Sequence, residues 1–408
     1  MSAARQHAST VSGSRGDAAS TEGASIRLLV IGHTYITRFA QAKYDALVRR
    51  HPDVSVLALV PERWHDGLLE RRAEERTGER LAVTALPVAF SGWGSRYVFR
   101  SPRLLSLLHE FRPNVVQVEH EPVALSLLQL NIVLGALRQR PGIVVFSWED
   151  IVQRRNPMMS LLSRAIERRN VPRIDHAIPG NGDAVKILQA KGYRGPMTLL
   201  PQVGVDPQEF APGREDALRA ELRLGDNFVV GFAGRIVREK GVLTLARALA
   251  RLPERDWKLL LVGDGPALPK TRDILRASGL DDRLRHVPAV PHLALPRYYR
   301  CMDAFVLPSE TTPLWKEQFG HVLLEAMACG LPIIASSSGF IPKVVGEAGM
   351  IFPEGDARAL GEALSRMIGD AGLRADLVRR GHTAVEERYS HDALADRIYD
   401  VYREVFDG

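Results

Sequence analysis

Short apolar runs alternate with longer amphipathic stretches along most of the chain, starting at Ile26. This alternation is typical of a parallel sheet that is buried on both faces and whose strands are joined by helices. The runs fall into two sets, separated by a polar, proline-containing stretch at residues 206–216. We therefore predict an α/β protein with two doubly wound, Rossmann-like domains that face a cleft. The predicted strands are residues 26–31, 54–60, 81–88, 115–118, 143–146, 177–178 and 197–200 in the first set, and 228–233, 258–262, 284–287, 304–307, 333–335 and 350–352 in the second.

These patterns divide the chain into four parts. Residues 1–24 are rich in Ser, Ala and Gly and lack an apolar stretch, so we expect a disordered leader and not a secretory signal. Residues 25–205 form the predicted first domain and residues 206–388 the predicted second domain. Apolar residues recur at helical spacing near the end, so we expect a closing helix over residues 389–408.

The composition is that of an ordinary globular protein. Of the 408 residues, 45% are hydrophobic and 25% charged, which argues against wholesale disorder. The two cysteines, Cys301 and Cys329, cannot form a disulfide framework or a four-thiolate zinc site, which favours a reducing compartment. A net charge of +6 is compatible with a phosphorylated ligand or an anionic membrane surface and selects neither. No apolar run reaches the roughly 18 residues of a membrane-spanning helix.

Signatures of several other chemistries are absent from the sequence. It has no phosphate loop ending in Gly-Lys-Ser/Thr, no His-Glu-x-x-His and no Cys-x-x-Cys. It has no Asp-x-Asp pair either, and we expect neither a metal ion nor a cofactor. The basic residues are spread out and not interleaved with aromatic residues, which argues against a nucleic-acid partner.

Two cations follow a predicted strand in the second half of the chain. Arg235 and Lys240 come five residues apart after Gly234, and a helix is predicted to begin near Val242. At the carboxyl end of a strand, beside a helix N-terminus, such cations suit a phosphate or diphosphate. The alternative is a loop with two solvated cations.

Two glutamates, Glu317 and Glu325, lie eight residues apart on either side of Gly320. Gly320 would let the chain approach a ligand closely, and the predicted helix after it would offer N–H groups to an anion. The glutamates would reach different parts of an extended ligand. A surface helix with an incidental glutamate is the alternative.

A polar cluster, Glu119, His120 and Glu121, follows a predicted strand in the first half. These side chains could transfer a proton or hold a hydroxyl group, although a lone histidine is more often structural. Trp148 and Glu149 end the next strand and are candidates to shape an acceptor pocket, while core packing explains the tryptophan equally well.

Taken together, Gly-Arg-x4-Lys-Gly, the Val262–Pro266 segment Val-Gly-Asp-Gly-Pro and Glu-x7-Glu running into Ala-Met-Ala-Cys-Gly-Leu-Pro resemble the retaining GT-B glycosyltransferases of family four, the glycosyl transferases group 1. The resemblance is strong over the second half. In the first half it rests on the strand pattern, residues 120–122 and residues 200–206. It implies a GT-B fold and a hexosyltransferase-type enzyme (EC 2.4). Such an enzyme moves a sugar from a nucleotide-diphosphate sugar to an acceptor hydroxyl, with retention and without a metal.

The resemblance also implies roles for individual residues. Arg235 and Lys240 would contact the donor diphosphate, Glu325 the ribose hydroxyls and Glu317 the donor sugar. His120 resembles the histidine at the reacting sugar in the lipid-directed mannosyltransferases of the family. The alignment with these enzymes stays open by one residue, so Glu119 is the alternative at that position. The implied donor-binding residues are Gly234, Phe319, Gly320, His321, Val322, Glu325 and Gly32.

The sequence departs from the family after its first predicted strand. Many relatives have a glycine-rich loop there, whereas this chain has only Gly32. His33 and Arg38 are candidates to supply hydrogen-bonding or positive groups instead. The expected acceptor side thus comprises Glu119, Glu121, Trp148, Glu149 and Arg38.

Residues 153–169 are basic and amphipathic and could lie on an anionic membrane, although we prefer an ordinary domain helix with a solvated cationic face. We expect a cytoplasmic protein, for which peripheral contact with the inner membrane face stays open. Two other functions also stay open: a non-catalytic GT-B protein that binds a nucleotide-sugar, and an epimerase or phosphorylase on the same scaffold. The sequence does not fix the sugar, the base or the acceptor.

Overall fold

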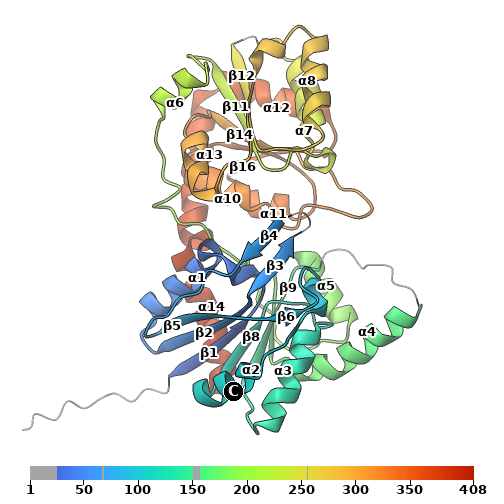
Figure 1. Ribbon diagram of the computed structural model, residues 1–408. Helices are drawn as coiled ribbons and strands as arrows, with labels where there is room; N and C mark the ends of the chain where they lie inside the picture. The colour runs from blue at the N-terminus through green and yellow to red at the C-terminus, as the bar shows by residue number, and fades with distance from the viewer. Residues whose placement is uncertain (1–24, 67–68, 150–156, 255) are drawn as a thin grey trace, which may run out of the picture.

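The structure is a computed structural model, and it describes residues 25–66, 69–149, 157–254 and 256–408. The predicted leader, residues 1–24, lies outside the described residues. Two six-stranded parallel sheets, each covered by helices, form two domains that lie one above the other (Figure 1). The prediction of two doubly wound α/β domains is therefore confirmed.

The first domain is built on strands whose apolar runs are buried almost throughout, as expected for a sheet with helices on both faces. Its sheet has the order β10-β9-β8-β1-β2-β5. The strands are β1 (Ile26–Ile31), β2 (Val54–Pro61), β5 (Leu81–Leu86), β8 (Val115–Val118), β9 (Gly142–Ser147) and β10 (His176–Pro179), and the helices are α1 (Arg38–Arg50), α2 (Arg103–Phe111), α3 (Leu125–Ala136), α4 (Pro157–Asn170) and α5 (Gly182–Ala190).

The second domain repeats this arrangement, with the sheet order β13-β12-β11-β14-β15-β16. Its strands are β11 (Phe228–Ala233), β12 (Trp257–Val262), β13 (Leu284–Val287), β14 (Ala304–Leu307), β15 (Ile333–Ser336) and β16 (Gly349–Phe352). Its helices are α6 (Asp216–Glu221), α7 (Val242–Ala250), α8 (Leu268–Ala277), α9 (Leu295–Tyr299), α10 (His321–Ala328), α11 (Ile341–Val345), α12 (Ala357–Gly369) and α13 (Ala371–Ala384).

Each sheet reverses its strand order at one place, between β1 and β8 in the first domain and between β11 and β14 in the second. Ligands of open α/β sheets bind at such points, beyond the carboxyl ends of the strands. The backbone is crowded there. A Cβ added to Gly32, just after β1, would lie 2.7 Å from the Cβ of Glu119, and one added to Gly241 would lie 1.7 Å from the Pro308 carbonyl oxygen.

The last helix, α14 (His391–Asp407), returns from the second domain and packs beside α1 of the first (Figure 1). Its apolar face is buried in the first-domain core, with Leu394, Ile398 and Tyr402 among the residues there. At its exposed edge, the Arg50 guanidinium contacts the Asp396 carboxylate at 2.6 Å. The helix thus ties the end of the chain to the first sheet.

Two strand predictions were wrong in detail. Residues 197–200 form no strand, and only Met197 makes a single bridge, to Ala177. The backbone N–H groups of Thr198 and Leu200 still donate to Ala177 and Pro179 of β10, but Pro179 has no N–H to return a hydrogen bond, so the ladder does not extend. The run predicted as residues 81–88 is divided at Pro87 for the same reason.

Two antiparallel pairs had no strong signal in the sequence. One consists of β3 (Arg63–Asp66) and β4 (Leu69–Arg72), which carry charged side chains in place of an apolar run. The other consists of the two-residue strands β6 (Val88–Ala89) and β7 (Val98–Phe99), too short to show a period. Both pairs lie outside the two large sheets.

The crowding at Gly241 can be tested at the place where the second sheet reverses its strand order. Gly241 has φ 69° and Gly279 has φ 68°, but no atom lies within 4 Å of a Cβ added to Gly279. We expect Gly279→Ala to lower the free energy of unfolding by about 1 kcal/mol from backbone strain alone. Gly241→Ala should cost about 1–3 kcal/mol more, because the new methyl group overlaps the Pro308 carbonyl. Urea denaturation measures both, and equal losses would contradict the crowded geometry.

Candidate functional site

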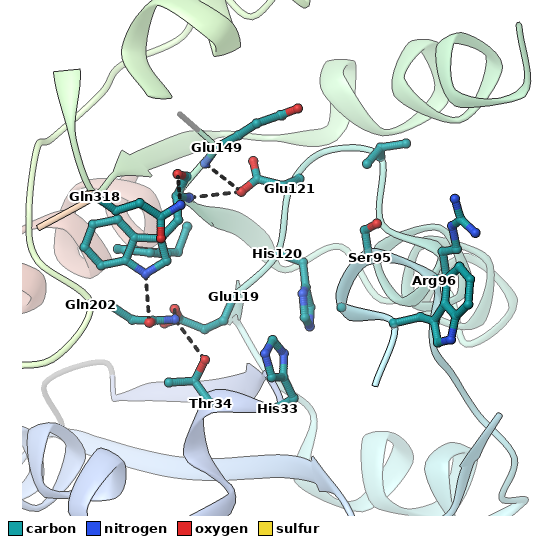
Figure 2. A pocket seen from close by; sticks show the side chains of 15 residues that line it. His33, Thr34, Ser95, Arg96, Glu119, His120, Glu121, Glu149, Gln202 and Gln318 are labelled. Atoms are coloured by element: carbon teal, nitrogen blue, oxygen red, sulfur yellow. Dashed lines mark hydrogen bonds between the residues drawn. The ribbon is translucent and has the colours of Figure 1, made fainter. Parts of the chain in front are cut away.

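A cavity of about 690 Å³ opens at the carboxyl ends of β1, β8 and β9. Almost all of its wall comes from the first domain, and Gln318 comes from the second, so the cavity reaches the domain boundary (Figure 2). The lining residues are His33, Thr34, Trp93, Gly94, Ser95, Arg96, Glu119, His120, Glu121, Val123, Phe146, Trp148, Glu149, Gln202 and Gln318.

His120 stands at this cavity in a stack of aromatic rings. Its ring lies 5.1 Å from the ring of His33, which in turn stacks on Trp64 at 4.2 Å. The Nε2 atom of His120 is 3.0 Å from the Tyr97 hydroxyl. Burial and the neighbouring His33 hold the pKa of His120 well below its usual value, so the ring is neutral near pH 7. A neutral imidazole can both accept and donate a hydrogen bond.

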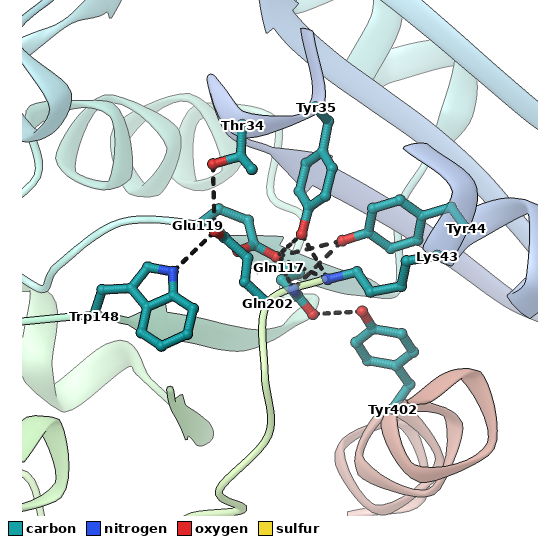
Figure 3. A network of polar contacts seen from close by, with 9 residues as sticks. All are labelled: Thr34, Tyr35, Lys43, Tyr44, Gln117, Glu119, Trp148, Gln202 and Tyr402. Carbon is teal, nitrogen blue, oxygen red and sulfur yellow. Dashed lines mark hydrogen bonds and ion pairs between the residues drawn. The ribbon is translucent and has the colours of Figure 1, made fainter. Parts of the chain in front are cut away.

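Glu119, the neighbour of His120, has a different environment (Figure 3). Its carboxylate is 3.4 Å from the Lys43 ammonium, and both side chains are about 99–100% buried. It also accepts hydrogen bonds from Tyr35, Tyr44, Gln117 and Gln202. Burial lowers the pKa of Lys43, and the Glu119 charge opposes that shift. Glu119 is therefore the centre of a buried polar network, whereas the His120 ring stands beside His33 at the cavity wall.

The network extends in two directions. The Tyr402 hydroxyl of α14 donates to the Gln117 side chain, which connects the last helix to β8. On the cavity side, the Gln202 amide donates to Thr34 at 3.0 Å and accepts from the Trp148 indole N–H at 2.9 Å. Gln202 thus connects the buried carboxylate to two residues that line the cavity.

Glu121 fixes the loop after β9. It accepts hydrogen bonds from the backbone N–H groups of Trp148 and Glu149, both at 3.0 Å, and from the Ser147 hydroxyl. Burial, with the nearby Glu149 charge adding to it, raises the pKa of Glu121 to about 7. Glu149 itself is paired with Lys191. Glu121 and Glu149, like Glu119, thus have protein partners at the cavity wall.

Trp148 joins the two domains. Its ring makes an edge contact with Phe319 at 5.8 Å, and its carbonyl oxygen accepts from the Gln318 side chain at 3.1 Å. A second link is the ion pair between Lys316 and Asp183, at 2.5 Å. The loop before α10 therefore touches the first domain beside the cavity.

In the second domain, the Lys240 ammonium contacts the Glu317 carboxylate at 2.6 Å. The same Glu317 oxygen accepts from the Ser309 hydroxyl at 2.7 Å, and the Lys240 ammonium lies over the Trp315 ring at 5.1 Å. The structure thus brings together residues 77 positions apart in sequence, at the carboxyl edge of β11 and β14.

Arg235 follows β11 on the same edge and is exposed. Gly234 precedes it with φ 138°, a conformation that favours glycine. Within the described part of the chain, no hydrogen bond or ion pair occupies the Arg235 guanidinium. Arg38 resembles it in this respect: its backbone N–H donates to Glu74 at 2.9 Å, while its exposed side chain has no partner among those residues.

Glu325 lies buried on α10 and has two partners that the sequence gave no reason to expect. The His292 Nε2 atom is 2.9 Å from one carboxylate oxygen, and the Tyr299 hydroxyl donates to the other at 2.7 Å. The ring of His292 also packs on Phe39 of the first domain, with centroids 3.9 Å apart. The second predicted glutamate therefore lies beside a further contact between the domains.

The start of α10 brings the other predicted donor residues together. Gly320 is the N-cap residue with φ 83°, so the helix begins at His321 with free N–H groups. Phe319 is buried between Trp148, Phe340 and Tyr389, and Val322 packs against the second-domain core. Burial lowers the pKa of His321, which keeps its ring neutral.

Comparison with known proteins adds the family. Residues 214–402 match the family described as "Glycosyl transferases group 1". The second domain thus matches the glycosyl transferases group 1 family. This matched region, called the group 1 domain below, contains Arg235, Lys240, Glu317 and Glu325. These four residues belong to the motifs on which the resemblance was based.

The curated relatives match about half of this chain. The chain is 35% identical over 215 residues to a D-inositol 3-phosphate glycosyltransferase of Saccharomonospora viridis, a match that covers 49% of this chain and 48% of the relative. It is 31% identical over 205 residues to an alpha-D-kanosaminyltransferase of Streptomyces kanamyceticus, covering 48% and 52%. The chain thus spans about half the length of the curated relatives it matches.

Solved structures match both domains together. Sucrose-phosphate synthase from Thermosynechococcus elongatus aligns with a TM-score of 0.68 and 22% identity, covering 93% of this chain and 99% of that one. The Anabaena protein HepE, solved in complex with UDP-glucose, aligns with a TM-score of 0.65 and 17% identity, covering 92% and 99%. At these identities the likeness concerns the fold, and the two facing domains form the GT-B fold.

The group 1 domain and its partner domain also contain site residues that the sequence analysis missed. Most are aromatic or polar residues outside any motif, and the sequence gave no signal for them because their partners lie far along the chain. They are Lys43, Trp64, Trp93, Arg96, Tyr97, Gln202, His292, Tyr299 and Ser309. Among the described residues, no group of three or more His, Cys, Asp or Glu side chains could hold a metal ion. The expected independence of metal stays a prediction.

The buried pair beside the cavity gives a second test. Lys43→Met leaves the Glu119 charge buried without its cation, so we expect a loss of about 3–5 kcal/mol in the free energy of unfolding. Arg49→Met removes an exposed ion pair with Asp392 from the same helix α1 and should cost at most about 1 kcal/mol. Urea denaturation compares the two variants. A loss for Lys43→Met no larger than that of the control would contradict the central role of the pair.

Proposed function

We propose that this protein is a retaining glycosyltransferase. It would transfer a sugar from a nucleotide-diphosphate sugar to an acceptor hydroxyl, without a metal ion. The family of the second domain and the GT-B fold support the reaction class. The observation that carries the proposal is the Lys240–Glu317 pair at 2.6 Å, with the free guanidinium of Arg235 on the same sheet edge.

The two cations suit the leaving group. Negative charge grows on the nucleoside diphosphate as the bond between the sugar and the phosphate breaks. Arg235 and Lys240 would stabilise that charge from fixed positions, and the free N–H groups at the start of α10 would add to the effect. Positive groups that are already in place need no reorganisation during the reaction.

Glu317 suits a sugar hydroxyl. One of its carboxylate oxygens is occupied by Lys240 and Ser309, while the other has no partner in the described part of the structure. That oxygen is free to accept a hydrogen bond from a donor sugar. Glu325, which the resemblance assigns to the ribose, keeps lone pairs for a further hydrogen bond beside those from His292 and Tyr299.

The acceptor would occupy the cavity of about 690 Å³ in the first domain, where His120 presents a neutral ring. The carboxylates around this cavity already have partners. Glu119 is enclosed by its donors, Glu121 holds the loop after β9, and Glu149 is paired with Lys191. This arrangement supports a front-face displacement in place of a covalent enzyme intermediate. The acceptor oxygen bonds to the anomeric carbon as the phosphate oxygen departs, and the phosphate takes the acceptor proton.

The donor is proposed only as a class. One matched structure, HepE, was solved with UDP and with UDP-glucose, and curated relatives are named for inositol phosphate and kanosamine chemistry. For this chain, the base and the sugar are left to experiment. Thermal shifts with uridine, guanosine and adenosine diphosphates would rank the bases, because a ligand that binds the native state raises its melting temperature.

Release of nucleoside diphosphate from a panel of nucleotide-sugars tests the reaction. Lys240→Ala should slow this release by about 10²-fold, because one charge-stabilising contact in the transition state is lost. Glu317→Gln should also slow it. Lys343→Ala, which removes an exposed lysine on α11 whose ammonium has no ion pair among the described residues, should leave the rate unchanged.

Three outcomes would contradict the proposal. If no donor in the panel is turned over although one of them binds, the protein is a nucleotide-sugar-binding protein. If turnover requires inorganic phosphate and no acceptor, it is a phosphorylase. If Lys240→Ala and Lys343→Ala are equally active, the proposed role of the cation is wrong.

A further inference from the structure

Helix α4 lies on the outer edge of the first domain (Figure 1). It exposes an apolar stripe. Met158 is 76% exposed, Leu161 69% and Leu162 55%. Their spacing of three and four residues places them on one face of the helix. An adjacent face of the helix, with Ser163, Ile166 and Asn170, is buried. The helix is therefore anchored in the domain by one side and presents large apolar side chains to the surroundings with another.

A second helix extends this apolar surface. Ile132 on α3 is 61% exposed, and α3 packs against α4. The Asn131 amide donates to the Asn170 side chain at 3.3 Å, which joins the two helices. In the described part of the chain, eleven large apolar side chains are exposed, and four of them lie on these two neighbouring helices. Such clustering marks an interaction surface more strongly than single exposed residues do.

Arginines surround the apolar side chains. Arg164, Arg168 and Arg169 are exposed on α4, and Arg173 follows the helix. No ion pair or hydrogen bond neutralises these four guanidinium groups within the described ranges of the chain. The one carboxylate on α4, Glu167, is paired with Lys191. Among the described residues, the surface therefore carries a local positive charge that no acidic side chain pairs with.

A groove between the two helices has the chemistry of an anion site. It has a volume of about 450 Å³ and is lined by Ile132 on one side and by Arg168, Arg169 and Arg173 on the other. Guanidinium groups bind phosphate oxygens through paired hydrogen bonds. A phospholipid carries a phosphate next to its hydrocarbon chains. The arginines of the groove suit the phosphate, and the apolar side chains beside the groove suit the hydrocarbon chains.

We propose that α4 and the groove between α3 and α4 dock on the surface of an anionic lipid bilayer. Met158, Leu161 and Leu162 would enter the boundary between head groups and acyl chains, and the arginines would contact lipid phosphates. In the described residues, no helix is both long and apolar enough to cross a bilayer. The sequence alone favoured a solvated helix face; the exposure of three large apolar side chains changes that interpretation.

Co-sedimentation of the full chain with lipid vesicles tests the proposal without relying on enzyme activity. We expect binding to vesicles of phosphatidylcholine mixed with phosphatidylglycerol and little binding to pure phosphatidylcholine. High salt should weaken the binding because it screens the arginines.

Matched variants locate the surface. Arg168→Ala combined with Arg169→Ala should reduce partitioning on the order of 20-fold, at about fivefold for each basic residue. Arg247→Ala with Arg251→Ala removes two exposed arginines from the second domain and should have no effect. Leu161→Ser should reduce partitioning about tenfold. Leu105→Ser, at an exposed leucine on α2, is its control.

Several results would overturn the proposal. Equal binding to both vesicle types would show that the protein does not prefer anionic lipid. Unchanged partitioning of the double arginine variant would show that α4 and its groove are not the surface that binds the vesicles. Light scattering provides a further check. If the chain self-associates through α4, and Leu161→Ser abolishes that association while the wild type binds no vesicles, the occupant is a second copy of the chain.

Discussion

The carboxylate of Glu119 is a buried charge, and the first domain is organised around it. A buried charge is costly unless a cation and hydrogen-bond donors surround it. Its partners come from distant parts of the chain: Lys43 on α1, Gln117 on β8 and Gln202 after β10. Tyr402 of α14 completes the arrangement through Gln117. The last helix must therefore pack on the first domain for the network to close.

The same network positions the proposed site. His120 follows Glu119 in the chain, so fixing the carboxylate fixes the start of the loop that carries the histidine. Gln202 carries the connection to Trp148, whose ring meets Phe319 of the second domain. The buried network and the residues that line the cavity are thus connected by hydrogen bonds and ring contacts. A change in the buried pair would affect both stability and the shape of the cavity.

Fold and family could be predicted from the sequence because their signals are local. Apolar runs marked the strands of both sheets, and the spacing of Arg235, Lys240, Glu317 and Glu325 marked the family domain. The environment of each residue could not be predicted. Glu119 and His120 are adjacent in sequence and both line the cavity, yet only the carboxylate is the centre of the buried network, while the ring stacks on His33. Tertiary contacts alone determine this difference.

The missed elements have the same cause. The β3–β4 pair has charged strands, and the segment at residues 197–200 has a strand pattern but lies beside Pro179 of β10, which has no N–H to pair with it. The contact of His292 with Phe39 joins residues of different domains that belong to no motif. The exposure of Leu161 on α4 depends on which face α3 and the sheet leave uncovered, and an amphipathic pattern alone does not fix that face.

The central claim is that the two cations of the second domain hold the donor diphosphate against the cavity of the first. A crystal structure of the full chain with a bound nucleoside diphosphate tests it most directly. We predict phosphate oxygens within about 3 Å of both Arg235 and Lys240, with the terminal phosphate directed toward the cavity that His120 lines. A diphosphate bound elsewhere, or bound there without contact to either side chain, would contradict the account.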